Sequence, residues 1–552
     1  MDKHLLVMCF CVLAAGILRA QVYTAGPQVL TFFSDVDDSD QPYALYLPKD
    51  FEPARKYPLV ISLHGAWSNH RLNLKRVFGK GNKPGESDAE ASRYFPPFKD
   101  VDYIVASPYA RGTMGYQGIP ERDVYAVLED VRRRFPIDPD RIYLTGLSMG
   151  GGGTLWLGLT RPDLWAAIAP VCPAPPEGAE SLAPNALNLP VHLFHGDQDP
   201  AVHVDVSRRW QKLLLNLDSN VEYVEYPGVK HNSWDYAYTG AAIFDWFDKF
   251  RHDPFPQRVR FVTEAYKYRS AYWVEVDGLT PGTLASIDAR FAEKNRIEVK
   301  ASNLDGFTLR LAGHPSFTST HPLEVSVNGV TYKIRAAESA SFTKNGDSWT
   351  AGRYAPPVGA KRPGLEGPIS EAVASRHIYV YGTSAAAGPE EINRRREQAM
   401  RAAEWSAPHL KLLLTLHALT DEEITEADIT GGNLVLFGTR ETNKVIARFS
   451  GQFPLELNAG AADYGLVFVY PAGNRYVVVN SGLPFWTGAE SAHRPGLDAD
   501  DPAYRVLMTL PDCILFKGSL ANVVAEGRFD RNWKIPAPVA EKLRATGAVE
   551  VR

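Results

Sequence analysis

The stretch Arg141-Ile142-Tyr143-Leu144-Thr145-Gly146-Leu147-Ser148-Met149-Gly150 decides the fold of this 552-residue chain. Its first half is a short apolar, β-branched run, which predicts a buried strand. Its second half has the form G-x-S-x-G, and the small residues of 151–158 that follow predict a helix. A sharp turn from strand to helix presents a serine hydroxyl at the positive end of the helix, and the glycines avoid collisions that a Cβ would cause. We therefore predict that Ser148 is a nucleophile.

Two further loops supply partners for this serine. The apolar run 189–194 predicts a strand and leads into a loop that contains Asp199, and the alternating run 221–226 leads into a loop that contains His231. The order serine, acid, histidine is the one that the strand–serine–helix pattern requires. An imidazole removes the proton of a serine hydroxyl, and a buried carboxylate orients the imidazole. The sequence thus predicts a catalytic triad of Ser148, Asp199 and His231.

Alternatives exist for the acid and for the base. Asp197 and Asp205 lie in the same segment as Asp199, and the pattern H-G-x-x-D-x-x-V favours Asp199. Thirteen other histidines are present, but only His231 follows the last strand before a predicted terminal helix at 239–250.

A second loop predicts an oxyanion hole. The apolar run 58–63 predicts a strand that leads into His64-Gly65-Ala66-Trp67. In this arrangement one N–H comes from the residue after the nucleophile, here Met149, and the other from the loop after the third strand. Ala66 and Trp67 are the two candidates for the second donor. Each such N–H can stabilise the transition state by roughly 3 kcal/mol.

The segments His64-Gly65, 121–131, 137–151 and His231-Asn232-Ser233-Trp234 resemble those of secreted α/β-hydrolases. The most similar groups are the polyhydroxybutyrate-depolymerase and feruloyl-esterase-like enzymes, with the prolyl oligopeptidase catalytic domain beside them. The resemblance covers residues 30–252. It implies an α/β-hydrolase fold and a serine hydrolase. The segment before the first core strand is too short for the β-propeller that usually precedes prolyl oligopeptidase domains.

Three functions remain open at this point. The first is cleavage of carboxylic esters in an acylated polysaccharide or a short-chain polyester. The second is a serine peptidase of prolyl oligopeptidase type, and the third is an inactive binding or scaffold protein. The loops 67–81 and 110–120 carry no clear charge filter for a peptide terminus, which favours the ester substrate.

The first twenty residues indicate export. A short polar start precedes fourteen mostly apolar residues at 5–18, and Leu18-Arg19-Ala20 is a plausible cleavage site. This pattern predicts a signal peptide at 1–20 and a secreted or periplasmic protein, with an uncleaved anchor as the alternative. Its removal leaves Cys172 and Cys513, which lie in different predicted domains and are expected to be free thiols.

Beyond the catalytic domain, predicted at 21–257, the pattern changes twice. Short alternating runs separated by turn residues predict an antiparallel, immunoglobulin-like β-sandwich at 258–350. A Pro/Gly-rich linker is predicted at 351–369. Alternating strands and helices then predict a small parallel-sheet α/β domain at 370–552.

Several classes of partner find no support in the sequence. The net charge is −5, with neither a basic stripe nor an acidic tail, so no nucleic acid is expected. No clustered metal-ligand set and no nucleotide-binding glycine loop occurs, so neither a metal nor a cofactor is expected. No membrane span beyond the N-terminal segment is predicted, and the oligomeric state is left open. The expected partner is an acyl ester or a peptide, which is possibly polymeric.

Overall fold

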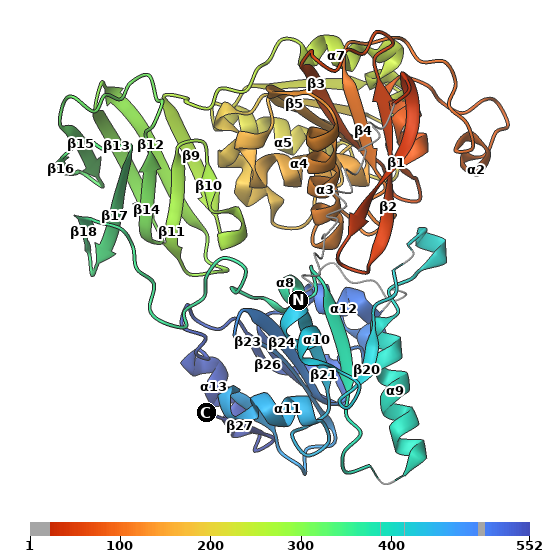
Figure 1. Cartoon of the computed structure of the whole chain (residues 1–552), viewed down its shortest axis with the longest axis vertical. Coiled ribbons are helices and arrows are strands. Elements are labelled where there is room, and N and C mark those ends of the chain that lie inside the picture. Colours follow the sequence, from red (N-terminus) through yellow and green to blue (C-terminus); the bar gives the residue numbers. More distant parts are fainter. Residues whose placement is uncertain (1–22, 387, 413, 495–502) are drawn as a thin grey trace, which may run out of the picture.

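The computed structural model describes residues 23–386, 388–412, 414–494 and 503–552, and the predicted signal peptide lies outside them. Three domains follow one another along the chain (Figure 1). The first, in red to yellow, lies beside the green second domain, and the blue third domain lies beneath the first. In the part of the chain that the structure describes, no helix has the length and apolar character needed to cross a bilayer.

The first domain is built on an eight-stranded sheet in the order β1-β2-β4-β3-β5-β6-β7-β8. β2 pairs antiparallel with both β1 and β4, and all other neighbours are parallel. This is the α/β-hydrolase order, as the resemblance implies. The strands are β1 (Gly26–Ser34), β2 (Ser39–Leu47), β3 (Tyr57–Leu63), β4 (Ile104–Pro108), β5 (Ile137–Leu147), β6 (Ala167–Val171), β7 (Val191–Gly196) and β8 (Val221–Tyr226).

Helices cover both faces of this sheet, because its central strands are apolar on both sides. α3, α4 and α5 pack into one core and α1 and α7 into the other. The helix predicted at 239–250 is shorter than expected, since Gly240 and Ala241 have φ of 61° and only α7 continues. The helices are α1 (His70–Val77), α2 (Asp88–Ala91), α3 (Ile119–Arg134), α4 (Met149–Thr160), α5 (Asp205–Asn216), α6 (Trp234–Ala237) and α7 (Ala242–Phe247).

The second domain consists of two five-stranded sheets, in the orders β10-β11-β14-β17-β18 and β16-β15-β13-β12-β9. Their facing side chains, among them Trp273 and Phe291, form one apolar core. The expectation of a wholly antiparallel sandwich is wrong, because β13 and β15 pair in parallel. The strands are β9 (Arg258–Thr263), β10 (Ser270–Ala271), β11 (Val274–Leu279), β12 (Ala285–Glu293), β13 (Arg296–Ser302), β14 (Leu304–Arg310), β15 (Leu323–Val327), β16 (Val330–Ile334), β17 (Ser339–Asn345) and β18 (Ser348–Ala351).

The third domain has a seven-stranded sheet in the order β20-β19-β21-β24-β23-β25-β26. The prediction of a parallel sheet is correct for only part of this sheet. β20, β19, β21 and β24 are parallel, but β23, β25 and β26 join antiparallel. Short turns connect β23 to β24 and β25 to β26. The strands are β19 (His377–Tyr381), β20 (Ala418–Thr420), β21 (Asn433–Phe437), β23 (Tyr464–Ala472), β24 (Arg475–Gly482), β25 (Cys513–Lys517) and β26 (Ser519–Gly527).

Six helices and a small separate ribbon complete the described part of this domain. The ribbon pairs a strand inside the domain with the last strand of the chain. Its core also takes in Val36, Met114 and Ile119 of the first domain, so an apolar interface joins the two. These elements are α8 (Ile369–Ala372), α9 (Pro389–Ala403), α10 (Glu426–Gly431), α11 (Lys444–Phe449), α12 (Ala503–Thr509), α13 (Ala537–Ala545), β22 (Leu455–Leu457) and β27 (Val549–Val551).

The second half of the segment predicted as a linker packs against its neighbours, whereas residues 355–359 are exposed. Lys361 and Glu366 are each only 2% exposed. The Lys361 ammonium pairs with Asp512 at 2.5 Å, and the Glu366 carboxylate accepts the backbone N–H groups of Tyr266 and Lys267. Residues 351–369 therefore join the second and third domains through buried polar contacts, which composition alone does not predict.

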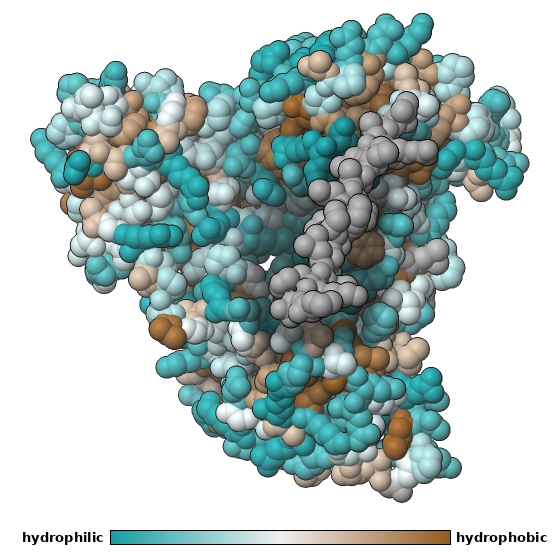
Figure 2. Space-filling model, in the orientation of Figure 1, coloured by the Kyte–Doolittle hydropathy of each residue, from teal (hydrophilic) through white to brown (hydrophobic). Residues whose placement is uncertain are grey.

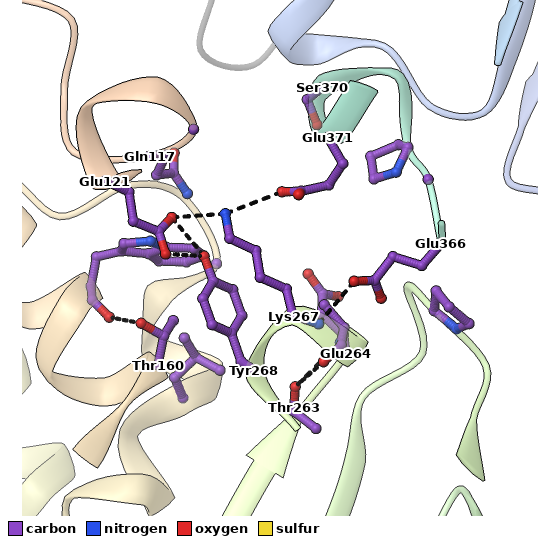
Figure 3. Close-up of a pocket in the computed structure, with 18 of the residues that line it drawn as sticks. Gln117, Glu121, Thr160, Thr263, Glu264, Lys267, Tyr268, Glu366, Ser370 and Glu371 are labelled. Atoms are coloured by element: carbon purple, nitrogen blue, oxygen red, sulfur yellow. Dashed lines mark hydrogen bonds and ion pairs between the residues drawn. The ribbon is translucent and has the colours of Figure 1, made fainter. Parts of the chain in front are cut away.

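All three domains meet around Lys267, beside the hollow that Figure 2 shows between them, lined mainly by hydrophilic side chains. The Lys267 ammonium lies between the carboxylates of Glu121 in α3, at 3.0 Å, and Glu371 in α8, at 3.4 Å (Figure 3). The Tyr268 hydroxyl also donates to Glu121. Burial opposes the charge of Lys267, but the two carboxylates raise its pKa above the usual value. Removing one member would leave a buried charge without its partner, which is strongly destabilising.

Glu366 makes the stability of this junction depend on pH. Burial, together with the charge of Glu371, raises the pKa of Glu366 from 4.5 to about 8, although Lys267 and two backbone N–H groups oppose the shift. Between those two pH values the folded protein holds a proton that the unfolded chain has lost, so stability falls as pH rises. Across the pH range from 4.5 to about 8, the free energy of unfolding falls by an amount on the order of 5 kcal/mol.

We expect the apparent Tm of the wild type to fall relative to that of Glu366→Gln as the pH rises from 5 to 8.5. Calorimetry at half-unit pH steps measures both. Glu264→Gln, an exposed acid beside the same hollow, is the matched control and should keep the wild-type slope. Equal slopes in the wild type and Glu366→Gln would contradict the prediction.

Candidate active site

Ser148 lies at the turn between β5 and α4, in the strained backbone conformation that the sequence predicts. Its φ is 54°, in the left-handed region that favours glycine. The flanking glycines permit this turn. A Cβ on Gly146 would lie 2.4 Å from the Gly150 carbonyl oxygen, and one on Gly150 would lie 2.3 Å from the Leu63 carbonyl oxygen. Any larger residue at either position would displace the strand that carries the nucleophile.

The structure brings the three predicted triad residues together. Nε2 of His231 lies 2.9 Å from the Ser148 hydroxyl, and Nδ1 of His231 lies 2.7 Å from a carboxylate oxygen of Asp199. Ser148 follows β5, Asp199 follows β7 and His231 follows β8, so the carboxyl ends of parallel strands hold all three. This chain of hydrogen bonds can pass the serine proton to the imidazole.

Asp199 is the acid that the geometry selects. Its side chain is fully buried, whereas that of His231 is 26% exposed. Its second oxygen accepts the N–H groups of Ala201 and Val202 at 2.8 and 2.9 Å. Burial alone would raise the pKa of Asp199, but these bonds and the one to His231 lower it below the usual value, so the carboxylate stays charged.

The two other acids considered for this role lie elsewhere. Asp197 accepts the backbone N–H of Gly228, and Asp205 pairs with Arg208 on the surface of α5. Among the described residues, neither forms a hydrogen bond or an ion pair with His231.

The predicted oxyanion loop lies against the nucleophile. A Cβ on Gly65 would be 3.5 Å from the Cβ of Ser148. The Trp67 N–H is already donated to the Thr113 hydroxyl at 2.7 Å, so Trp67 is not the free donor. Within the described residues the N–H groups of Ala66 and Met149 donate to no protein acceptor. Of the three predicted oxyanion donors, Ala66 and Met149 therefore remain.

Several residues that support the loop were not singled out from the sequence. The Tyr116 hydroxyl donates to the His64 carbonyl at 3.0 Å, and the His64 ring lies 2.8 Å from the Tyr109 carbonyl. From the third domain, the Lys411 ammonium donates to the Trp67 carbonyl, and the Tyr109 hydroxyl donates to the Lys411 carbonyl. Their roles depend on contacts between distant segments, for which the sequence carries no local signal.

Cys172 lies behind the triad. Cys172 and Cys513 are both buried and free. The Cys172 thiol contacts the carbonyl oxygen of His231 at 3.5 Å, and burial raises its pKa to about 12. Cys172, Asp199 and His231 form the one group in the described residues whose ligand atoms lie close enough for a metal ion. Two of them already belong to the triad, and a thiol with a raised pKa is a poor ligand.

A cavity of about 710 Å³ opens beside the nucleophile. On one side it is lined by Tyr116, Met149 and Gly153 of the first domain, and on the other by Tyr504, Met508 and Arg528 of the third. The cavity thus opens next to Met149, the residue that follows the nucleophile, and lies between the first and third domains.

Comparison with known proteins gives a consistent result for the first domain. Residues 125–243 match the phospholipase/carboxylesterase family model. Acyl-protein thioesterase 1 of Mycosarcoma maydis is 33% identical over 115 residues, which is 20% of this chain and 48% of that protein. A poly(3-hydroxybutyrate) depolymerase of Ralstonia pickettii is 38% identical over 82 residues, 14% of this chain and 15% of that protein. The chain thus spans less than half the length of these curated relatives.

Among solved structures, a thermostable esterase is 29% identical, with a TM-score of 0.33, and covers 41% of this chain and 63% of its own. A ferulic acid esterase is 20% identical, also with a TM-score of 0.33, and covers 41% of this chain and all of its own.

Proposed function

We propose that this chain, whose N-terminal domain is an α/β-hydrolase, is a serine esterase that cleaves carboxylic esters through an acyl-enzyme on Ser148. The observation that carries the proposal is the unbroken hydrogen-bond chain from Ser148 through His231 to buried Asp199. An acylated polysaccharide or a short-chain polyester is the proposed natural substrate. The N-terminal apolar segment supports the further proposal that the enzyme is exported.

The reaction follows from this geometry. His231 accepts the proton of Ser148 as the hydroxyl oxygen attacks the ester carbonyl carbon, and the N–H groups of Ala66 and Met149 stabilise the oxyanion that forms. The imidazolium returns its proton to the alcohol oxygen as the ester C–O bond breaks. Water then attacks the acyl-enzyme by the same route and releases the acid. Asp199 keeps its charge throughout and stabilises the imidazolium.

Labelling and turnover together test the proposal. A fluorophosphonate probe should attach to Ser148, as located by peptide mass spectrometry. The enzyme should hydrolyse 4-nitrophenyl butyrate with little activity on prolyl or alanyl peptide amides. Comparable turnover of the amides would favour a peptidase of prolyl oligopeptidase type. A folded protein that is neither labelled nor active would favour the inactive scaffold.

The oxyanion loop yields a separate prediction. In Gly65→Ala the new Cβ would lie 2.8 Å from the side chain of Leu147, which is only 1% exposed and has little room to move, so we expect the loop to shift away from Ser148. Because one misaligned oxyanion donor costs up to about 100-fold in kcat, we expect kcat for 4-nitrophenyl butyrate to fall by at least tenfold. Gly81→Ala, where the nearest atom would be 3.9 Å away, should leave kcat unchanged. An unchanged kcat in Gly65→Ala would remove this loop from the reaction.

A further inference from the structure

The third domain supplies a wall of the substrate cleft. The cavity beside Met149 is lined by six residues of that domain, which come from the end of β26, from α12 and from the segment before it. A second cavity of about 310 Å³ continues from it to the three-domain junction and shares Trp156, Met508 and Arg528 with it. The cleft therefore runs from the nucleophile along the face of the third domain.

Contacts at the opposite side of the site hold this wall in place. Lys411 of the third domain donates to the carbonyl of Trp67 in the oxyanion loop, and its own carbonyl accepts the Tyr109 hydroxyl. Met114 and Ile119 are buried in the core of the third domain. The third domain is thus fixed against the site by an apolar interface and by polar contacts.

The described residues that line the cavity beside the nucleophile carry a net positive charge. They include Arg494, Arg505 and Arg528 and one acid, Glu177. Arg494 is already paired with Glu526 at 3.0 Å and also donates to Thr509. Arg528 differs, because its guanidinium has no ion pair or hydrogen bond with any residue that the structure describes. It is exposed, and it lines both cavities.

The position of Arg528 is defined by the second domain. Gly282, in the turn before β12, has a φ of 82°, and a Cβ there would lie 2.5 Å from Cδ and 2.6 Å from Nη1 of Arg528. The guanidinium therefore packs directly on this turn, beside the two cavities that Arg528 lines. A guanidinium that is held in place binds a carboxylate through two parallel hydrogen bonds.

We propose that Arg528 binds a carboxylate carried by the ester, so that the preferred substrates are anionic esters that extend from Ser148 along the third domain. The proposal rests on the esterase function above and names the substrate class of the same site. It also gives the third domain a role in specificity, which the sequence left unassigned.

Pairs of esters that differ only in charge test the proposal. On the acyl side, mono-4-nitrophenyl adipate is compared with 4-nitrophenyl hexanoate. On the alcohol side, 4-acetoxybenzoate is compared with 4-acetoxybenzamide. In at least one pair the wild type should favour the anionic ester in kcat/KM. Arg528→Gln should reduce that preference by about tenfold, mostly through KM, because a charge-assisted hydrogen bond is lost.

Variants of Arg528 and of a control arginine separate the effect of the Arg528 charge from a general effect on the fold. Arg528→Lys should keep part of the preference, and Arg528→Glu should reverse it. Arg394→Gln, on the exposed face of α9, should match the wild type on all four esters. The proposal is overturned if the wild type shows no anionic preference in either pair, or if Arg528→Gln slows anionic and neutral esters equally. Absence of both turnover and Ser148 labelling would instead overturn the esterase function itself.

Discussion

Replacing Ser148 by alanine should reduce ester hydrolysis by about 10⁴- to 10⁶-fold, leaving only the rate that binding and the oxyanion donors provide. The acyl group would have no oxygen to which it can transfer. The hydrogen bond to His231 would also be lost, but the backbone turn at φ 54° is set by the flanking glycines and should persist. The thermal unfolding curve should therefore stay close to that of the wild type.

Turnover of 4-nitrophenyl butyrate, together with fluorophosphonate labelling of both proteins, measures this effect. Ser450→Ala is the control, because the Ser450 hydroxyl donates to the nearby carbonyl of Ala447 on the surface of the third domain. A folded Ser148→Ala variant that keeps more than a few per cent of the activity would show that another group performs the reaction.

The second large effect is expected for Asp199→Asn, with kcat about 10⁴-fold lower. One oxygen of Asp199 accepts two backbone N–H groups, from Ala201 and Val202, so the asparagine carbonyl oxygen must take that place. Its amide nitrogen then faces Nδ1 of His231. Because that amide is a donor, Nδ1 must accept, the proton moves to Nε2, and the imidazole can no longer accept the proton of Ser148.

The two neighbouring acids are matched controls for this substitution. Asp197→Asn and Asp205→Asn remove a charge from the same segment without touching His231, so each should change kcat less than tenfold. Steady-state kinetics of all three variants at one pH shows which of the three acids supports catalysis. A larger loss in Asp197→Asn or Asp205→Asn than in Asp199→Asn would reassign the acid.

The sequence predicted those parts of the site that depend on local chemistry. The glycines around Ser148 and the loops after two strands are encoded within a few residues, so the triad and Met149 could be predicted, and the structure brings the three triad residues together. The choice between Ala66 and Trp67 could not, because it depends on a hydrogen bond to Thr113, which lies far away in the chain. The cleft wall could not be predicted for the same reason, since Arg528 and Met149 come to line one cavity only through the packing of two domains.

The larger errors also concern contacts over long distances. Alternation identified most strands of the second and third domains, but it carries no information on strand direction, so the parallel pair β13–β15 and the antiparallel half of the third sheet were missed. Proline and glycine content suggested a free connector at 351–369. The buried carboxylate of Glu366 shows that a segment with turn residues can be fixed by partners in another domain.

The position of Arg528 C-terminal to all three triad residues has a consequence for biosynthesis. Ser148, Asp199 and His231 leave the ribosome long before β26 is made, and domains generally fold in the order in which they are synthesised. A chain in which only the first domain has folded therefore has an assembled triad in an open groove, and the cleft is completed when the third domain docks. On this account, discrimination between esters is acquired after the catalytic groups are in place.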